Sequence, residues 1–459
     1  MTDLRTRPVT ATRTSRTWAR DASLVAGWAI LLFVVALWTI NGGLSASDDA
    51  FTSVGRLCGL VASALLLMQI FLMARVPWVE QAWGQDALTR LHRIVGFGSF
   101  TLMIAHIALI VTGYAAADPA RVWDTIVDLT LNYPAMLMAV AGTLALIMVV
   151  VTSFRAARRR LRYESWHLIH LYAYLGAGLA LPHQLWTGRD FLASPLATVF
   201  WWSLYIACAG AVLVFRIGIP LWRSLRSRIR VLDVRRETAD TISVVVGGPG
   251  VEKLGAQAGQ FLQWRFLDGP GWTRAHPFSL SAPPVNDTMR FTASVIGDGT
   301  ARLATLRPGT RVLVEGPYGR MHSGTRTRDK ILLVGAGIGI TPMRALLEAL
   351  PADRGDITVI NRVRSIDEAT LHREIEHLSY RRGANYRVLA GHRMSGRQSW
   401  LPSSDSRLDD VQALLLMCPD VAERDVFVCG PAAWADAVRS AARRAGTPAQ
   451  NIHHESFHL

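Results

Sequence analysis

Six long apolar segments occupy the first half of the chain, and they limit its possible folds more than any other feature. A hydrocarbon core about 30 Å thick requires about 20 helical residues for each crossing. Every segment is long enough for one crossing, so we predict a bundle of six transmembrane helices. The predicted spans are residues 23–40, 54–74, 91–114, 133–154, 165–185 and 195–222.

The distribution of arginine predicts how these spans are oriented. Residues 1–22, 155–162 and 223–230 are strongly basic, whereas residues 41–53 and 115–132 carry several aspartates. Cytoplasmic loops carry the excess of Lys and Arg in membrane proteins. We therefore predict a multi-pass protein of the cell membrane with both termini in the cytoplasm. Topology then accounts for much of the net charge of +14, so no nucleic-acid partner is expected.

Four histidines lie inside the third and fifth predicted spans, where ionisable side chains are costly and usually functional. His92 and His106 are 14 positions apart in one span, and His170 and His183 are 13 apart in the other. Each separation corresponds to about 20 Å along a helix, and both spans run in the same direction. His92 should lie level with His170, and His106 with His183. Each pair would then ligate one haem iron from both sides.

Two alternatives remain open for these spans. The histidines would otherwise be buried side chains satisfied by hydrogen bonds, and His167 is a rival inner ligand to His170. On a straight helix His170 and His183 lie about 140° apart, so Pro182 would have to reorient His183. Arg56 either pairs with a haem propionate or an anionic acceptor, or extends its charge to the membrane surface.

The sequence pattern of the second half of the chain is typical of two globular domains. Short strands separated by Gly and Pro over residues 228–326 predict a small antiparallel β-barrel. Strands alternate with helices over residues 327–459, which predicts an α/β nucleotide-binding domain. The expected fold is thus a multidomain membrane protein with an all-α bundle over residues 23–222, a barrel and a Rossmann-like domain.

Glycines and arginines of the last domain suggest a pyrophosphate site. VGAGIGITP, residues 334–342, places three glycines between a strand and a helix, where the backbone can approach a phosphate. Arg362 and Arg364 follow the next strand and suit the 2′-phosphate of NADPH, with NADH as the alternative. Cys429 ends a further strand and is either a core residue or a neighbour of the nicotinamide ring.

These motifs together resemble a known family. HPFSLSAPP, GDGT, GPYG, GAGIGITP and VFVCGP are similar to the motif set of the ferredoxin–NADP reductase superfamily. With the four-histidine membrane half, the chain resembles the ferric reductase and NADPH oxidase family of transmembrane flavocytochromes from residue 23 to residue 459.

The resemblance implies two haems b, FAD and NADPH as cofactors, and it implies roles for particular residues. Phe278 would lie against the flavin ring, Ser279 would hydrogen-bond the flavin, and Phe457 would cover the flavin until nicotinamide displaces it. Ser279, Cys429 and Phe457 would be the catalytic residues. The other cofactor-binding residues would be His276, Pro277, Gly297 and Thr300 for FAD, and Gly335, Gly337, Gly339, Thr341, Pro342, Gly430 and Pro431 for NADPH.

One departure from the family pattern bears on the electron acceptor. Animal NADPH oxidases carry a second histidine one turn beyond the outer ligand of the third span, where this chain has Ile110. We therefore expect electrons to pass from NADPH through FAD and two haems to an extracellular acceptor, with a ferric chelate favoured over dioxygen. No obligatory protein partner is evident. The alternatives are a membrane subunit that supplies electrons to a partner protein, and a haem transporter or sensor.

Overall fold

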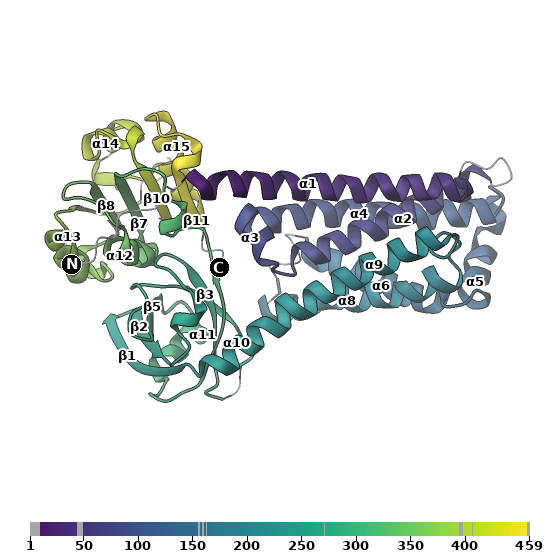
Figure 1. Ribbon diagram of the computed structural model, residues 1–459, viewed down its shortest axis with the longest axis horizontal. Helices are drawn as coiled ribbons and strands as arrows, with labels where there is room; N and C mark the ends of the chain where they lie inside the picture. The colour runs from purple at the N-terminus through teal and green to yellow at the C-terminus, as the bar shows by residue number, and fades with distance from the viewer. Residues whose placement is uncertain are drawn as a thin grey trace. The chain divides into compact units, whose positions relative to one another are not determined.

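The computed structural model describes residues 10–43, 49–154, 157, 160–161, 163–269, 271–393, 398–405 and 407–456. The chain divides into two compact units (Figure 1). One unit is helical and comprises Ser15–Gly218. The other consists mainly of Ile219–Leu459.

The helical unit is built from long helices joined by short connections. α3 (Pro77–Trp83) and α5 (Val122–Asn132) are short, and π-helical turns follow α1 and α9 at Thr39–Gly43 and Val212–Gly218. The long helices are α1 (Thr10–Trp38), α2 (Ala50–Leu72), α4 (Gln85–Tyr114), α6 (Met136–Ser153), α8 (Tyr163–Trp186) and α9 (Pro195–Ala211).

Among the described residues, five helical segments are long and apolar enough to cross a membrane, and they coincide with five of the six predicted spans. They are Trp18–Gly43, Ala50–Leu72, Ala87–Tyr114, Met136–Ser153 and Pro195–Ser227. The remaining predicted span forms α8, which has 24 residues but contains three histidines and Pro182. These residues lower its mean hydropathy, because imidazoles are polar. The count of six crossings therefore stays a prediction.

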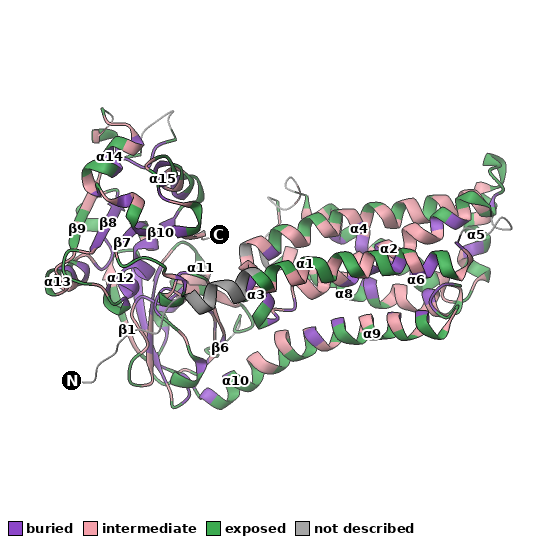
Figure 2. Ribbon diagram, turned by 45° about the horizontal axis from the view of Figure 1, so that its top comes forward, coloured by how far each residue is buried: buried purple, intermediate pink, exposed green. Residues whose placement is uncertain are grey.

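The outer faces of these helices are apolar, which is typical of helices in contact with lipid. Large side chains such as Leu32, Leu144 and Val199 are more than 60% exposed. Figure 2 shows that buried residues are sparse along the long helices. Inside the unit, small residues let helices approach closely: a Cβ on Gly142 of α6 would lie 2.8 Å from the carbonyl oxygen of Gly176 on α8.

The largest segment of the second unit begins with α10 (Ile219–Ser227), which overlaps the end of the last predicted span. Ser224 fixes this helix to a strand of the next domain. Its hydroxyl donates to the carbonyl of Val314 (2.6 Å) and accepts from the N–H of Val314 (3.0 Å). The end of the last predicted span, residues 219–222, therefore belongs to the second unit.

Two three-stranded antiparallel sheets follow α10 and enclose one hydrophobic core. Trp264 and Phe291 are fully buried in it, with their ring centroids 4.8 Å apart. Isolated bridges join the sheets at Arg230–Arg311 and Leu280–Phe291. The sheet orders are β1-β2-β5 and β4-β3-β6, with β1 Arg230–Thr238, β2 Thr241–Gly247, β3 Phe261–Phe266, β4 His276–Ser279, β5 Thr288–Ser294 and β6 Val312–Tyr318.

A five-stranded parallel sheet forms the rest of the unit, as the alternating pattern predicts. Hydrophobic clusters cover both faces of this sheet beneath the helices α12 (Ile340–Ala349), α13 (His372–Arg382), α14 (Asp410–Met417) and α15 (Ala432–Arg444). The strand order is β11-β10-β7-β8-β9, with β7 Ile331–Ala336, β8 Ile357–Val363, β9 Asn385–Ala390, β10 Asp425–Gly430 and β11 Ile452–Ser456.

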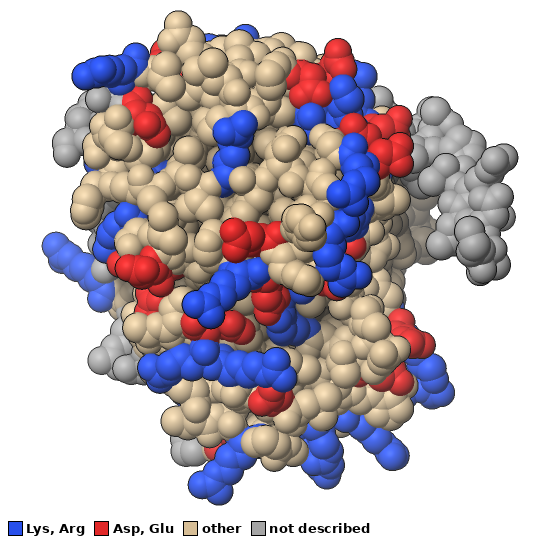
Figure 3. All heavy atoms as spheres, turned by 90° about the vertical axis from the view of Figure 1, so that its left-hand side faces the viewer, with Lys and Arg blue, Asp and Glu red and all other residues tan. Residues whose placement is uncertain are grey.

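Basic and acidic side chains are intermixed over the face of this unit that Figure 3 shows. Some basic and acidic side chains of this unit form ion pairs. For example, Arg302 contacts Asp268 at 2.6 Å, and Arg439 contacts Asp436 at 2.8 Å. Part of the charge of this unit is therefore neutralised in pairs.

Candidate functional site

The four predicted haem ligands lie on α4 and α8, where they form two pairs. The rings of His92 and His170 meet edge to face, with their centroids 6.0 Å and their planes 61° apart. His106 and His183 lie within electrostatic range of each other. Metal–imidazole bonds measure about 2 Å in zinc sites. A linear bridge with bonds of that length would separate the two nitrogens by about 4 Å, and a centroid separation of 6.0 Å is compatible with such a bridge.

Hydrogen bonds hold Nδ1 in three of these imidazoles. Nδ1 of His92 donates to the carbonyl of Gln69 (3.0 Å), and Nδ1 of His106 donates to the carbonyl of Gly55 (2.8 Å). The hydroxyl of Ser153 lies 3.3 Å from Nδ1 of His170 and already donates its proton to a carbonyl of α6, so it accepts from His170. Metal-bound histidines usually direct the second ring nitrogen to such a partner.

The outer pair differs in one respect. Nδ1 of His183 is buried and has no hydrogen-bond partner in the described part of the chain. A buried polar atom without a partner is unusual. His167, the alternative inner ligand, lies on the same helix as His170, and the choice between these two histidines stays a prediction.

Glycines of α2 make room for the histidines of α4. A Cβ on Gly59 would lie 2.6 Å from Nδ1 of His106. One turn earlier, Gly55 supplies the carbonyl that His106 contacts, and a Cβ there would lie 3.2 Å from Ile110. The position of His106 therefore depends on two small residues of α2.

Arg56, between these glycines, forms an ion pair with Asp190 from the segment between α8 and α9. Its Nε donates to Asp190 Oδ2 at 2.8 Å and its Nη2 to Oδ1 at 2.5 Å. Both side chains are largely buried, at 12% and 8% exposure. The structure thus gives Arg56 a protein partner, which neither sequence-based alternative named.

The predicted flavin strand, β4, leaves one hydroxyl without a partner. Ser279 is 3% exposed, and its Oγ makes no hydrogen bond within the described residues. Phe278 stacks on Phe291 (centroids 4.8 Å apart, planes 12° apart) and lies parallel to His276 (3°). Pro277 pairs with Gln263 of β3. An unpartnered buried hydroxyl on this strand fits the predicted hydrogen bond to a flavin.

The loop predicted to hold the FAD pyrophosphate lies next to this strand. The hydroxyl of Thr300 accepts from the N–H groups of Ile296 (2.9 Å) and Gly297 (3.2 Å), so it shapes the loop. A Cβ on Gly299 would lie 2.9 Å from the His276 ring and 3.4 Å from a guanidinium nitrogen of Arg274. A small depression here is lined by Asp268, Arg274, His276, Gly299 and Arg302. Its cationic side chains suit a phosphate.

The glycine-rich loop of the α/β domain packs tightly between β7, α12 and β10. A Cβ on Gly335 would lie 2.7 Å from Cα of Ile340, and one on Gly339 would lie 2.3 Å from the carbonyl oxygen of Cys429. Gly337 has φ of +55°, a conformation that favours glycine. Pro342 is buried, and Thr341 donates to the carbonyl of Ile338 (2.9 Å) at the start of α12. The loop therefore presents its backbone, as a pyrophosphate site requires.

The two arginines predicted to select NADPH have different surroundings. The Arg362 guanidinium is buried and donates to backbone carbonyls of Val363, Leu389 (3.3 Å) and His392 (3.2 Å). Burial lowers the pKa of Arg362. Arg364 is exposed beyond the end of β8. Only Arg364 thus has its side chain in solvent, where a nucleotide phosphate can reach it.

The end of β10 is more enclosed than the sequence suggests. Cys429 is fully buried within the hydrophobic cluster that includes Met321 and Phe427, and burial raises the pKa of its thiol. Gly430, followed by Pro431, packs against Trp434, because a Cβ there would lie 2.7 Å from the indole ring. Phe457, the predicted flavin cover, lies outside the described residues.

Two functional contacts of this unit have no signal in the sequence. Glu455, opposite Cys429 on β11, accepts from the N–H of Arg320 in the GPYG loop (2.6 Å). Glu374 of α13 joins Arg290 of β5 to Arg344 of α12. These partners are 30 to 135 positions apart in the chain, so no local pattern links them.

Metal chemistry beyond the histidine pairs has no support in the described part of the chain. No group of three or more His, Cys, Asp or Glu side chains there is placed to hold a metal ion. A haem iron with two axial histidines needs only two protein ligands, so this finding does not bear on the pairs.

Two family models match the chain. Residues 58–181 match the model described as ferric reductase like transmembrane component, and residues 333–440 match the oxidoreductase NAD-binding domain. The first match includes His92, His106 and His170 but ends two residues before His183. The second includes the glycine-rich loop, Arg364 and Cys429.

Curated relatives resemble part of the chain. The glycine betaine monooxygenase reductase subunit of Chromohalobacter salexigens is 28% identical over 244 residues, covering 51% of this chain and 65% of that protein. The ferredoxin reductase component of the 3-ketosteroid-9-alpha-monooxygenase of Mycolicibacterium smegmatis is 30% identical over 241 residues, covering 50% and 65%. The chain thus spans less than two thirds of the length of these relatives.

Solved structures similar to the chain include a ferredoxin NADP+ reductase from Neisseria gonorrhoeae with bound FAD and NADP. It is 18% identical, with a TM-score of 0.41, and the match covers 50% of this chain and 100% of that one.

Proposed function

We propose that this chain, which combines a ferric reductase like transmembrane component with an oxidoreductase NAD-binding domain, is a transmembrane oxidoreductase. Electrons from cytoplasmic NADPH would pass through FAD and two haems b to an acceptor on the other side of the membrane. The observation that carries the proposal is the contact between His92 and His170, whose ring centroids are 6.0 Å apart on two different helices.

The chain's own residues would hold each haem by paired imidazoles. His92 and His170 would bind the inner haem, and His106 and His183 the outer one. The carbonyls of Gln69 and Gly55 keep Nδ1 protonated on α4, so that Nε2 carries the lone pair that binds iron. When bound, the haems would supply one-electron carriers within the membrane.

The second unit would receive two electrons at a time and deliver them singly. FAD, when bound, would supply the step between the two-electron donor NADPH and the one-electron haems. Ser279 would donate its unpartnered hydroxyl to the flavin, and the glycine-rich loop would place the NADPH pyrophosphate at the start of α12. Arg364 would favour NADPH over NADH by contacting the 2′-phosphate. Cys429 would border the nicotinamide through its backbone and strand end, and Phe457 would cover the flavin.

A ferric chelate is the favoured acceptor, and dioxygen reduced to superoxide is the other one considered. If two histidines hold each iron, they would occupy both positions that the haem leaves open, and the acceptor would be reduced at the haem edge. Ile110 adds an apolar side chain where the animal NADPH oxidases have a histidine. This difference argues against a dedicated oxygen-reducing pocket.

A second candidate function follows from the relatives. Several are reductase components of monooxygenases by name, which supports electron delivery to a partner protein. The two candidates differ in a simple assay: a terminal reductase reduces a ferric chelate when purified alone, whereas a subunit reduces it only after its partner is added.

Substitution of the ligands tests the proposal directly. His92→Ala and His170→Ala should each remove the same haem, and combining them should remove no more than either does alone. His377→Ala, on α13 in the second unit, is the matched control and should leave the haem content at two per FAD. Full haem content in both ligand variants would refute the assignment.

A further inference from the structure

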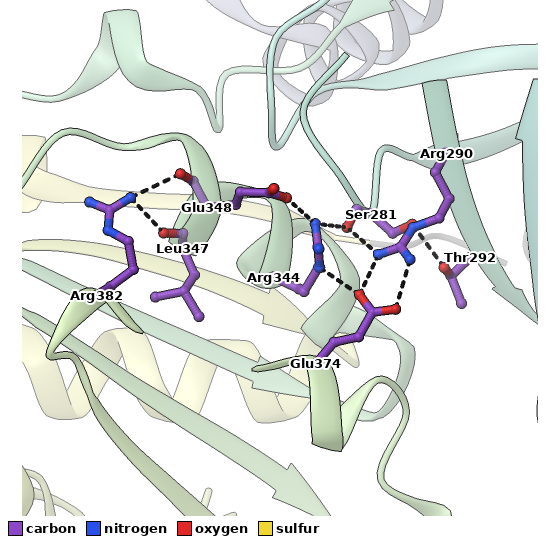
Figure 4. Close-up of polar contacts among 8 residues, drawn as sticks. All are labelled: Ser281, Arg290, Thr292, Arg344, Leu347, Glu348, Glu374 and Arg382. Atoms are coloured by element: carbon purple, nitrogen blue, oxygen red, sulfur yellow. Dashed lines mark hydrogen bonds and ion pairs between the residues drawn. The ribbon is translucent and has the colours of Figure 1, made fainter. Parts of the chain in front are cut away.

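A cluster of charged residues joins the flavin-binding part of the second unit to its nucleotide-binding part (Figure 4). Arg290 lies on β5, Arg344 on α12 and Glu374 in the first turn of α13. Ser281 follows β4 by two residues. The cluster therefore draws on the sheets of the first domain and on two helices of the second.

Glu374 is the centre of this cluster. Nη1 and Nη2 of Arg290 donate to its two carboxylate oxygens, each at 2.8 Å, and Nε of Arg344 donates to Oε2 at 2.9 Å. Two-pronged arginine–carboxylate contacts fix direction as well as distance. Hydrogen bonds from both arginines lower the pKa of Glu374 although burial opposes this shift. The carboxylate is therefore charged at neutral pH.

The same arginines hold the backbone next to the flavin strand. The carbonyl of Ser281 accepts from Arg290 and from Arg344, each at 3.2 Å, and its hydroxyl accepts from Arg290 (3.2 Å) and Thr292 (2.8 Å). Ser281 is two residues from Ser279, which would contact the flavin. Arg344 is on the helix that starts at the nucleotide loop, and Glu348 of that helix also contacts Arg344.

We propose that Glu374 is a positioning residue for hydride transfer, which sets the flavin strand and the nucleotide helix at their reactive separation through Arg290 and Arg344. The inference rests on the proposed function. In the step concerned, the nicotinamide loses a hydride, which is one proton with two electrons, and is oxidised, while the flavin gains that hydride and is reduced. Such a transfer requires the reacting atoms about 3–3.5 Å apart, and an error of about 1 Å costs on the order of 100-fold in rate.

An ion pair that only stabilises the fold would behave differently. Partly exposed ion pairs contribute little to stability, and the side chain of Glu374 is 37% exposed. A structural role would therefore leave the rate of hydride transfer unchanged. A positioning role changes this rate at saturating NADPH while FAD content stays the same.

The test measures flavin reduction in the full-length purified protein, anaerobically, by rapid mixing with saturating NADPH. Glu374→Gln keeps the side-chain size, and we expect a rate about 10- to 100-fold lower with normal FAD content. Glu376→Gln, on the exposed side of the same helix, is the matched control and should react at the parental rate. Arg290→Lys keeps the positive charge but cannot form the two parallel hydrogen bonds to Glu374, so this variant should be slow as well. The double variant with Glu374→Gln and Arg290→Lys should be no slower than the slower of the two single variants, because both changes break the same contact.

Four results would overturn the inference. The first is parental rates in both Glu374→Gln and Arg290→Lys. The second is equal slowing in Glu376→Gln. The third is slowing that appears only below saturating NADPH, which would mean that Glu374 affects nucleotide binding alone. The fourth is a parental protein whose bound FAD accepts no hydride from NADPH or NADH. That result would remove the proposed function too, whereas the other three leave it standing.

Discussion

At the scale of single residues, the membrane half depends on the fit between a glycine and an imidazole. Gly59 on α2 lies beneath His106 on α4, and any larger side chain would meet the ring. The sequence analysis predicts His106 as a ligand but gives no partner for it on α2, because that contact depends on helix rotation and separation.

Gly59→Ala should displace His106 and lower the haem content from two to about one per FAD. The added Cβ would lie 2.6 Å from Nδ1, which is closer than packed atoms allow. Gly210→Ala on α9 is the control, since a Cβ there has no neighbour within 4 Å. The measurement is the ratio of haem to FAD, with both quantified in the same purified sample of each variant. Equal haem content in both variants would contradict the proposed fit.

Ser279→Ala tests the flavin contact through stability rather than rate. Without FAD, removal of a buried unpartnered hydroxyl should be neutral or stabilising, because such groups cost about 1–3 kcal/mol. With FAD bound, the variant should lose a hydrogen bond. The rise in melting temperature on FAD addition should therefore be smaller than in the parent. An equal rise in both proteins would exclude this hydrogen bond.

Arg364→Gln should raise the KM for NADPH by about 10-fold or more, because a hydrogen bond to a charged group contributes about 1.5–3 kcal/mol. The KM for NADH should not change, since NADH lacks the 2′-phosphate. Arg373→Gln on α13 provides an exposed arginine control. If Arg364→Gln raises the KM for NADPH and for NADH equally, Arg364 does not contact the 2′-phosphate.

At the scale of elements, β10 is anchored by a buried aspartate. Asp425 is fully buried and accepts from the N–H groups of Thr327 and Arg328 (2.6 Å each), from Asn451 (3.1 Å) and from Nε2 of His453 (2.9 Å). It thus ties the connection between the two domains to β10 and β11. Burial favours the neutral carboxyl, but these hydrogen bonds outweigh it and lower the pKa of Asp425.

Asp425→Asn should destabilise the protein by about 3 kcal/mol, since it removes the charged partner of a buried cluster. For a cooperative unit of this size, that loss lowers Tm by about 6–12 °C. The pKa of Asp425 is lower in the folded protein than in the unfolded chain. Its stabilising effect is therefore present above the ordinary pKa of 3.8 and is lost as the pH falls from there through the lower, folded pKa. The difference in Tm between parent and variant should therefore shrink at acid pH. Asp436→Asn, in an exposed pair, should change Tm little at any pH.

Elements were largely predictable from the sequence, whereas the contacts between them were not. Glycines, prolines and alternating apolar residues predict β7, the loop at Gly337 and α12. Histidines in apolar segments predict the pairs on α4 and α8. However, Arg56 and Asp190 are 134 positions apart, and Arg290 and Glu374 are 84 apart. Any of 49 basic residues could pair with any of 35 acidic ones, and only the folded chain selects the partners.

At the scale of the whole molecule, the central claim is that one chain carries both a two-electron and a one-electron half. Two family models match separate parts of it. Haem binding would explain why the apolar helices α4 and α8 carry four histidines. A bound flavin would explain the buried Ser279 hydroxyl, which has no partner within the described residues. Neither half performs the proposed function without the other.

Anaerobic absorbance of the purified protein, recorded before and after addition of NADPH, tests this claim most directly when haem and flavin are quantified in the same sample. We predict two haems per FAD, with both the flavin and the haems reduced by NADPH. A flavin that is fully reduced while haem is absent or stays oxidised would contradict the account, since the histidine pairs would then serve another purpose.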